Sequence, residues 1–195
     1  MPTLHLTGEP DADRLLSESP LALLIGMLLD QQVPMETAFA GPEKLRTRMG
    51  GTLDAAAIAD ADPEAIAELF KESPAIHRFP GSMAARTQTL CRAVVDDWHG
   101  DAAAIWREGD PDGAEVLKRL KTLPGFGDQK ARIFLALLGK QYGLDAEGWQ
   151  RAAGDYAEPG SYRSVADIVD AESLAKVRAT KQAAKAAAKI GRAHV

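Results

Sequence analysis

The chain is poor in cysteine, since Cys91 is the only one among its 195 residues. A disulfide framework is therefore excluded, and so is a metal or iron–sulfur site built from cysteines of this chain. Cys91 itself lies in an apolar helical pattern and is expected to be a buried, inert thiol. No apolar run approaches the length of a membrane span, and the N-terminus has no basic segment followed by an apolar core. These absences predict a cytoplasmic protein.

Charge is distributed unevenly along the chain. The net charge of −5 does not favour a generic nucleic-acid binder. Residues 176–195, however, hold six basic side chains and no acidic one, whereas the other residues hold 17 basic and 28 acidic side chains. Binding to a phosphate backbone would therefore need a local patch. The basic C-terminal segment is either a solvated helix face or a source of additional phosphate affinity.

Apolar residues recur at helical spacing in nearly every segment, and runs of β-branched residues are few. This pattern predicts an all-α protein of one ordinary domain or two small lobes around a shared core. Residues 141–170 are the least regular part of the chain. The helices that we expect span residues 11–19, 21–32, 36–49, 54–59, 63–70, 83–98, 102–106, 114–122, 128–140, 147–153 and 171–189.

A short proline- and glycine-rich turn, Leu123-Pro124-Gly125-Phe126-Gly127, lies between two of these helical patterns. It predicts two helices joined by a tight hairpin. Because Gly125 and Gly127 have no Cβ, the backbone can bend sharply and approach a ligand closely. The free N–H groups at the start of the second helix would then form an anion site that suits a DNA phosphate. A plain connection between two helices has the same composition, so both interpretations stay open here.

Three segments of the chain together resemble the helix-hairpin-helix (HhH-GPD) superfamily of base excision DNA glycosylases. Residues 23–32 resemble the first helix, which ends in a turn containing glutamine, and residues 83–92 resemble the middle helix. The hairpin follows, with Ala131 at the usual spacing. The resemblance implies an all-α, two-lobed fold with a cleft between the lobes. The central lobe would span about residues 30–140, and the second lobe would combine about residues 1–29 with 141–195.

The resemblance also implies a partner and a reaction. Such enzymes bend duplex DNA, extrude a damaged or mispaired base into a pocket and cut its bond to the sugar. The protein would act as a monomer without a cofactor or metal. Gln31 and Gln32 lie where the family places its probing residue, and an amide suits that role; alternatively, they simply end an apolar helix. The residues implied in DNA binding are Gln31, Gln32, Leu123, Pro124, Gly125, Phe126, Gly127, Gln129 and Lys130.

The catalytic positions depart from the family pattern. Bifunctional relatives carry a lysine two residues after the second hairpin glycine, and its amine forms a Schiff base with the sugar. The corresponding residue here is Gln129, whose amide cannot do so, which predicts a monofunctional enzyme without lyase activity. Lys130 lies about 100° further around the helix and is expected to contact phosphate or solvent.

The family also uses an aspartate beyond the second hairpin helix to activate water or to stabilise positive charge on the sugar. Asp145 is one candidate, and Asp167 is the other if the segment before it is an insertion. Either residue could instead be a helix N-cap without a catalytic role. A third possibility is therefore that the catalytic residue is neither Asp145 nor Asp167. The competing functions are a non-catalytic, lesion-sensing protein on the same scaffold and a helical interaction module that does not bind DNA.

Overall fold

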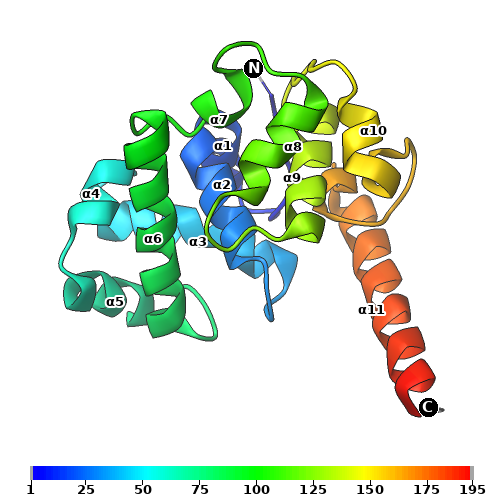
Figure 1. Cartoon of the computed structure of the whole chain (residues 1–195). Coiled ribbons are helices and arrows are strands. Elements are labelled where there is room, and N and C mark those ends of the chain that lie inside the picture. The colour runs from blue at the N-terminus through cyan, green and yellow to red at the C-terminus, as the bar shows by residue number, and fades with distance from the viewer. Residues whose placement is uncertain (1, 194–195) are drawn as a thin grey trace.

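The protein is described by a computed structural model over residues 2–193. Within that range every regular element is helical (Figure 1), which confirms the predicted all-α class. The elements are α1 (Pro10–Glu18), α2 (Pro20–Leu29), α3 (Met35–Arg48), α4 (Ala55–Asp60), α5 (Pro63–Lys71), α6 (Pro80–Trp98), α7 (Ala104–Arg107), α8 (Gly113–Lys121), α9 (Asp128–Gln141), α10 (Trp149–Ala153), η1 (Gly154–Ala157), η2 (Val165–Asp167) and α11 (Ala171–Ala193).

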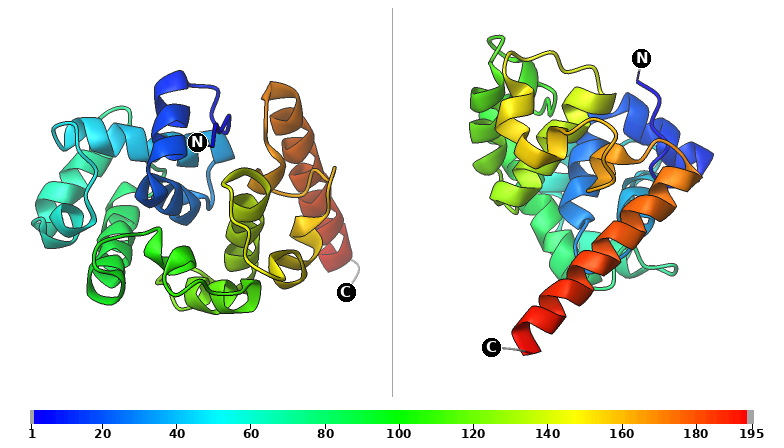
Figure 2. Two further views of the ribbon diagram at one scale, coloured as in Figure 1. Left: turned by 90° about the horizontal axis from the view of Figure 1, so that it is seen from above. Right: turned by 90° about the vertical axis from the view of Figure 1, so that its right-hand side faces the viewer.

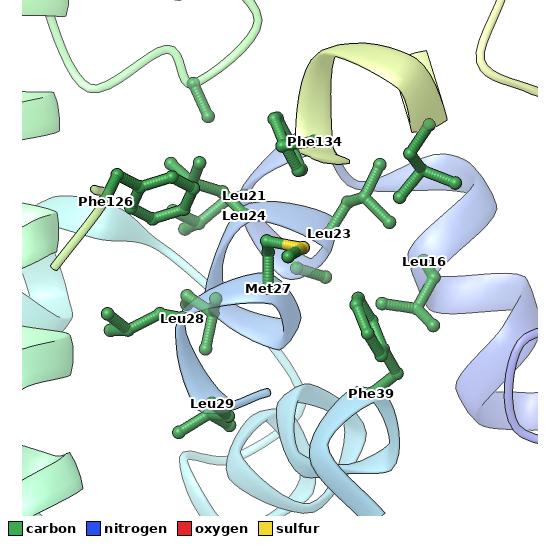
Figure 3. Packing of buried hydrophobic residues seen from close by; sticks show 14 of the residues in the cluster. Leu16, Leu21, Leu23, Leu24, Met27, Leu28, Leu29, Phe39, Phe126 and Phe134 are labelled. Carbon is green, nitrogen blue, oxygen red and sulfur yellow. The ribbon is translucent and has the colours of Figure 1, made fainter. Parts of the chain in front are cut away.

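The apolar helix α2 lies at the centre of the molecule, and its residues 21–29 are all buried. Helices α1 and α3 pack on it, α4 and α5 pack on α6, and α8, α9 and α10 pack on one another (Figures 1 and 2). Side chains from these groups meet around α2, where Met27 lies between Phe39 of α3 and Phe134 of α9 (Figure 3). One hydrophobic core therefore joins the elements that carry the candidate site.

Local sequence sets several of the helix starts. The Ser19 side chain accepts a hydrogen bond from the N–H of Ala22, and Pro20 occupies the first position of α2. The carboxylates of Asp54, Asp62 and Asp112 cap α4, α5 and α8 in the same way. These caps satisfy N–H groups that a helix start would otherwise leave without a partner.

Several predicted boundaries differ from the observed ones, and three have a clear physical reason. The helix expected to reach Gln32 ends at Leu29, because the backbone leaves the helical conformation at Asp30, whose ψ is 69°, and turns further at Gln32, whose φ is 60°. Helix α6 begins at Pro80 and not at residue 83, since a proline suits the first position of a helix. Helix α1 begins at Pro10 and not at residue 11, again with a proline at its start.

Helix α11 extends beyond the rest of the fold, as its red end shows in Figure 1 and in the right-hand view of Figure 2. Val177 is buried and Leu174 packs against the core, but residues 182–193 are exposed. The second half of this helix is therefore available to a partner along its whole circumference.

The prediction of a buried thiol is confirmed. Cys91 lies in α6 with no exposed surface, and burial raises the pKa of its thiol to about 12. None of the helices in the described part of the chain combines the length and the apolar composition needed to cross a lipid bilayer.

Candidate functional site

The predicted hairpin joins α8 to α9. The N–H of Phe126 donates to the carbonyl of Leu123 at 3.1 Å and closes the turn, while the side chains of both residues are buried in the core. While these two apolar side chains point inward, Gly125 between them and Gly127 after them lie on the surface. Gly125 has φ = 85°, a left-handed conformation that favours glycine.

The start of α9 is open to a ligand. Gly127 is the N-cap and supplies no capping side chain. Within residues 2–193, the N–H groups of Gly127, Asp128 and Gln129 have no hydrogen-bond acceptor, and all three residues are exposed. Free N–H groups together with the positive end of the helix dipole suit an anion such as a DNA phosphate.

The two hairpin glycines serve different needs. A Cβ on Gly125 would lie 2.5 Å from Cδ1 of Leu28, so this glycine allows the turn to pack on α2. A Cβ on Gly127 would meet no atom within 4 Å, and the backbone there is extended. The fold therefore tolerates a side chain at Gly127, and what a side chain would obstruct there is the approach of a ligand.

The glutamine turn after α2 presents its two amides differently. The Gln31 side chain is held, because its Nε2 donates to the carbonyl of Leu28 and its Oε1 accepts from Arg86, both at 3.0 Å. Gln32 is exposed, and its left-handed backbone is uncommon for a residue with a Cβ. Such strain often accompanies a functional site. Gln32 is therefore the amide that is free to reach a ligand.

His77 supports this turn from beneath and is only 3% exposed. Its Nε2 lies 3.1 Å from the carbonyl oxygen of Leu29 and 2.9 Å from that of Gln31, and its Nδ1 lies 3.0 Å from the backbone nitrogen of Phe79. A neutral ring with its proton on Nε2 satisfies all three contacts. His77 is thus a structural residue of the glutamine turn.

Phe79 is the functional candidate that the sequence analysis missed. It is 43% exposed, with the guanidinium of Arg78 stacked 5.3 Å from its ring centre. Through His77 its backbone is fixed to the glutamine turn, so an exposed aromatic ring accompanies Gln32 on the surface. An exposed aromatic ring offers a face on which a nucleobase can stack. The only sequence signal was its position directly before the helix-starting Pro80.

Lys130 does not point to phosphate or solvent as expected. Its Nζ donates to the carbonyls of Met27 at 2.8 Å and of Leu28 and Asp30 at 3.3 Å, which are the carbonyls at the end of α2. A helix leaves its last carbonyls without partners, and its negative end attracts a cation. Burial lowers the pKa of Lys130, and the neighbouring Asp30 opposes that shift. The start of α9 is thereby fastened to the end of α2.

Five ionisable residues, which we call the junction cluster, surround that contact. The Asp30 side chain is 9% exposed, and its carboxylate lies 3.9 Å from Nζ of Lys181. Burial raises the pKa of Asp30, whereas Lys181 and Lys130 lower it. Glu36 forms an ion pair with Arg178 at 2.8 Å through Oε1, while its Oε2 is buried without a partner. The cluster consists of Asp30, Glu36, Lys130, Arg178 and Lys181.

A line of basic residues continues from the junction cluster along α11. Arg178, Lys181, Lys185, Lys189 and Arg192 follow one another at three- or four-residue intervals and therefore share one face of the helix. The ion pairs of Arg178 with Glu36 and of Lys181 with Asp30 turn this face toward the end of α2. We call these five residues the basic stripe. Lys176 lies outside it and pairs with Glu172.

The two carboxylates predicted from the sequence lie elsewhere. Asp167 is the last residue of η2, where its carboxylate accepts from the backbone N–H of the N-cap Ser164, and it is ion-paired with Lys140 at 2.5 Å. Because Lys140 is near the end of α9, this pair lies roughly 18 Å along the helix from Asp128. Asp145 is exposed in the loop after α9, beside a cavity of about 340 Å³. Neither is beside the hairpin, and their catalytic role stays a prediction.

Gln129, at the position of the family's lysine, donates to the hydroxyl of Tyr156 at 3.0 Å.

Two cavities larger than the one beside Asp145, of about 810 and 520 Å³, adjoin the first turn of α11. None of these three cavities is lined by a residue of the hairpin turn or the junction cluster. In the described residues, no group of three or more histidine, cysteine, aspartate or glutamate side chains is placed to hold a metal ion.

Comparison with known protein families gives a match. The model of the family described as HhH-GPD superfamily base excision DNA repair protein matches residues 25–192. This range includes the glutamine turn, the hairpin and almost all of α11. No curated protein matches the chain.

Proposed function

Because the chain belongs to the HhH-GPD superfamily of base excision DNA repair proteins, we propose that it is a monofunctional DNA glycosylase. It would hydrolyse the N-glycosidic bond of a damaged or mispaired base in duplex DNA. The observation that carries this proposal is the uncapped, exposed N-terminus of α9, which Lys130 fastens to the glutamine turn. A site for a phosphate and a loop that can probe a base are thus combined in one unit.

In this proposal the surface around the hairpin receives the DNA. The N–H groups of Gly127 to Gln129 bind a phosphate of the strand that carries the target base. Gln32 and Phe79, which are both exposed, enter the space that the extruded base leaves, where an amide can pair and a ring can stack. The basic stripe lies against the flanking backbone.

The absence of a free amine supports hydrolysis without a lyase step. Gln129 has an amide at the position of the lysine that attacks the sugar. The Nζ of Lys130 donates to three backbone carbonyls at the end of α2, so it is directed into the fold and not toward a sugar. We therefore expect an abasic product with an intact strand.

This function is tested with a panel of duplexes that each carry one altered or mispaired base. The expected product breaks only after alkali treatment, and borohydride should trap no covalent complex with DNA. A trapped complex that is lost in Lys130→Met would instead identify a lyase. If no duplex in the panel yields abasic product while lesion duplexes are still bound preferentially, the second candidate holds, a lesion-sensing protein. The distance of Asp145 and Asp167 from the hairpin favours that alternative.

The basic stripe gives a prediction that does not depend on the lesion. Changing Lys185, Lys189 and Arg192 together to glutamine should weaken duplex binding by about tenfold or more, and should reduce the slope of log K against log salt by roughly 2 to 3. All three side chains are exposed, so the thermal stability should not change. Fluorescence anisotropy over a range of salt concentrations measures both quantities.

The matched control changes Arg14, Lys44 and Lys71, which lie on α1, α3 and α5 outside the stripe, to glutamine. Both triple variants lose the same formal charge. An equal reduction of the salt slope in the control would mean that only the overall charge matters, and that the stripe is a solvated helix face.

A further inference from the structure

His77 differs from the other buried polar residues in the distance along the chain that its contacts span. Its ring bonds to the carbonyls of Leu29 and Gln31, which lie 48 and 46 positions away in the sequence. A buried imidazole is costly unless it is hydrogen-bonded, so these contacts account for a polar ring at this place. The other buried polar residues bond through their side chains only within six positions of themselves; they are Asp13, Thr87, Ser164 and Ser173.

The two ring nitrogens contact the peptide groups next to the two exposed candidates. The carbonyl of Gln31, 2.9 Å from Nε2, belongs to the peptide group that leads into Gln32. The N–H of Phe79 donates to Nδ1 at 3.0 Å. A neutral imidazole is a donor at one nitrogen and an acceptor at the other, whereas an apolar side chain of similar size is neither. One rigid ring therefore fixes the backbone on both sides of the site.

The other contacts in this region each hold one side only. Arg86 of α6 donates to the Gln31 side chain, and the guanidinium of Arg78 covers the ring of Phe79. Among the hydrogen bonds of residues 2–193, those of His77 alone join the glutamine turn to the backbone of Phe79. Loss of the imidazole would therefore let the two exposed side chains move independently of each other.

We propose that His77 is a positioning residue that holds Gln32 and Phe79 in a fixed relative arrangement, so that both side chains enter the duplex as one unit. This inference rests on the proposed contact with DNA. The ligand that fits such a unit is a duplex with a gap in its base stack, which an amide and an aromatic ring can fill together. Two side chains that are positioned before binding lose less conformational entropy than two that move freely.

Two conservative variants each keep one half of the bonding of the ring. His77→Asn retains an acceptor for the N–H two residues further on, as in an Asx turn, whereas His77→Gln retains a donor that can reach the glutamine turn. Exchange of the Phe79 N–H in deuterated water, followed by NMR on the full chain without DNA, reports on the first bond. We expect exchange to be about tenfold faster or more in His77→Gln, and within about threefold of the wild-type rate in His77→Asn.

Duplex binding measures whether the link matters for DNA. Two duplexes of one sequence are compared, and one of them carries a tetrahydrofuran abasic site, where the missing base leaves a gap. We expect the wild-type chain to prefer the abasic duplex by about tenfold or more, and Phe79→Ala to lose most of that preference. Both His77 variants should lose at least about fivefold of it, because each breaks the link at one end. Adding Phe79→Ala to His77→Gln should then cost no more than about twofold.

A purely structural role of His77 would change other quantities. It would lower the melting temperature of both variants but keep the preference, since the preference is a ratio of two affinities of the same sample. Phe79→Ala would also cost its full factor in the His77→Gln background, and that result would overturn the inference. The matched control is His5→Gln, which replaces an exposed histidine of the N-terminal segment and should change neither the exchange nor the preference.

The two measurements separate this inference from the proposed function. If the wild-type chain prefers the abasic duplex and both His77 variants keep that preference, the inference is overturned and the proposed function is unaffected. If the wild-type chain binds the two duplexes equally, the proposed function fails. Faster exchange of the Phe79 N–H in His77→Gln would then still support His77 as the link between the two segments, and unchanged exchange would overturn it.

Discussion

Replacing Gly127 with valine is expected to weaken the binding of duplex DNA by about 100-fold, because a hydrogen bond to a charged group contributes about 1.5–3 kcal/mol. The valine side chain would cover the free N–H groups at the start of α9, where we propose that a phosphate binds. The fold should survive, since a Cβ at this position meets no atom within 4 Å. The cost to stability should stay near 1 kcal/mol, which reflects the poorer N-cap.

The measurement is fluorescence anisotropy with a labelled duplex, combined with thermal unfolding of the same sample. Ala65→Val is the matched control, because Ala65 is exposed in the first turn of another helix, α5. This control should bind as the wild type does. If Gly127→Val binds equally well while remaining folded, the α9 amides do not contact DNA, and the hairpin is a plain connection between helices.

Replacing Gly113 with alanine should have the largest effect on stability, a loss of about 3 kcal/mol or more, at the upper end of what overpacking costs. A Cβ on Gly113 would lie 2.4 Å from the backbone nitrogen and Cα of Trp149. Backbone atoms cannot rotate away as a side chain can, so α8 and α10 would have to separate. The N–H of Gly113 would then also lose its 2.7 Å hydrogen bond to the carbonyl of Glu147.

Thermal unfolding followed by circular dichroism measures this effect, and the melting temperature should fall by roughly 6–12 °C. Gly191→Ala is the control, since its Cβ meets nothing and alanine favours helix, so stability should be unchanged or slightly raised. Gly139→Ala should fall between the two, because the atoms that its Cβ would meet belong to the Trp149 ring, which can shift. A melting temperature of Gly113→Ala equal to that of wild type would contradict the close packing of α8 on α10.

The elements of the fold were largely predictable because the apolar pattern and the turn residues agree with each other. The hairpin is the best example, since Leu123 and Phe126 are the buried anchors of a turn whose glycines face out. The same pattern could not reveal that Lys130 reaches the end of α2. Residues 27 and 130 are far apart in sequence, and only packing brings them together.

The candidate site was predictable only in part, for a related reason. The glutamine turn was predictable from its resemblance, but the surroundings of Asp30 beside it were not. Its ion pair with Lys181 of α11 depends on packing between residues that are far apart in sequence. Asp145 and Asp167 are candidates for the catalytic aspartate because of their positions along the chain after the hairpin. Position along the chain does not reveal that Asp167 forms an ion pair with Lys140 at the far end of α9. The division of the chain into two lobes stays a prediction.

The Lys130 ammonium joins the two loops that would meet DNA. Because it bonds the last carbonyls of α2 from the first turn of α9, neither loop can shift without the other. The protein would then present a rigid template, and most of the distortion that accompanies base extrusion would have to occur in the duplex. A duplex whose stacking or pairing is already weakened by a lesion would need less energy to deform. Selection among bases would therefore begin with the deformation energy of the DNA, before any contact with the base itself.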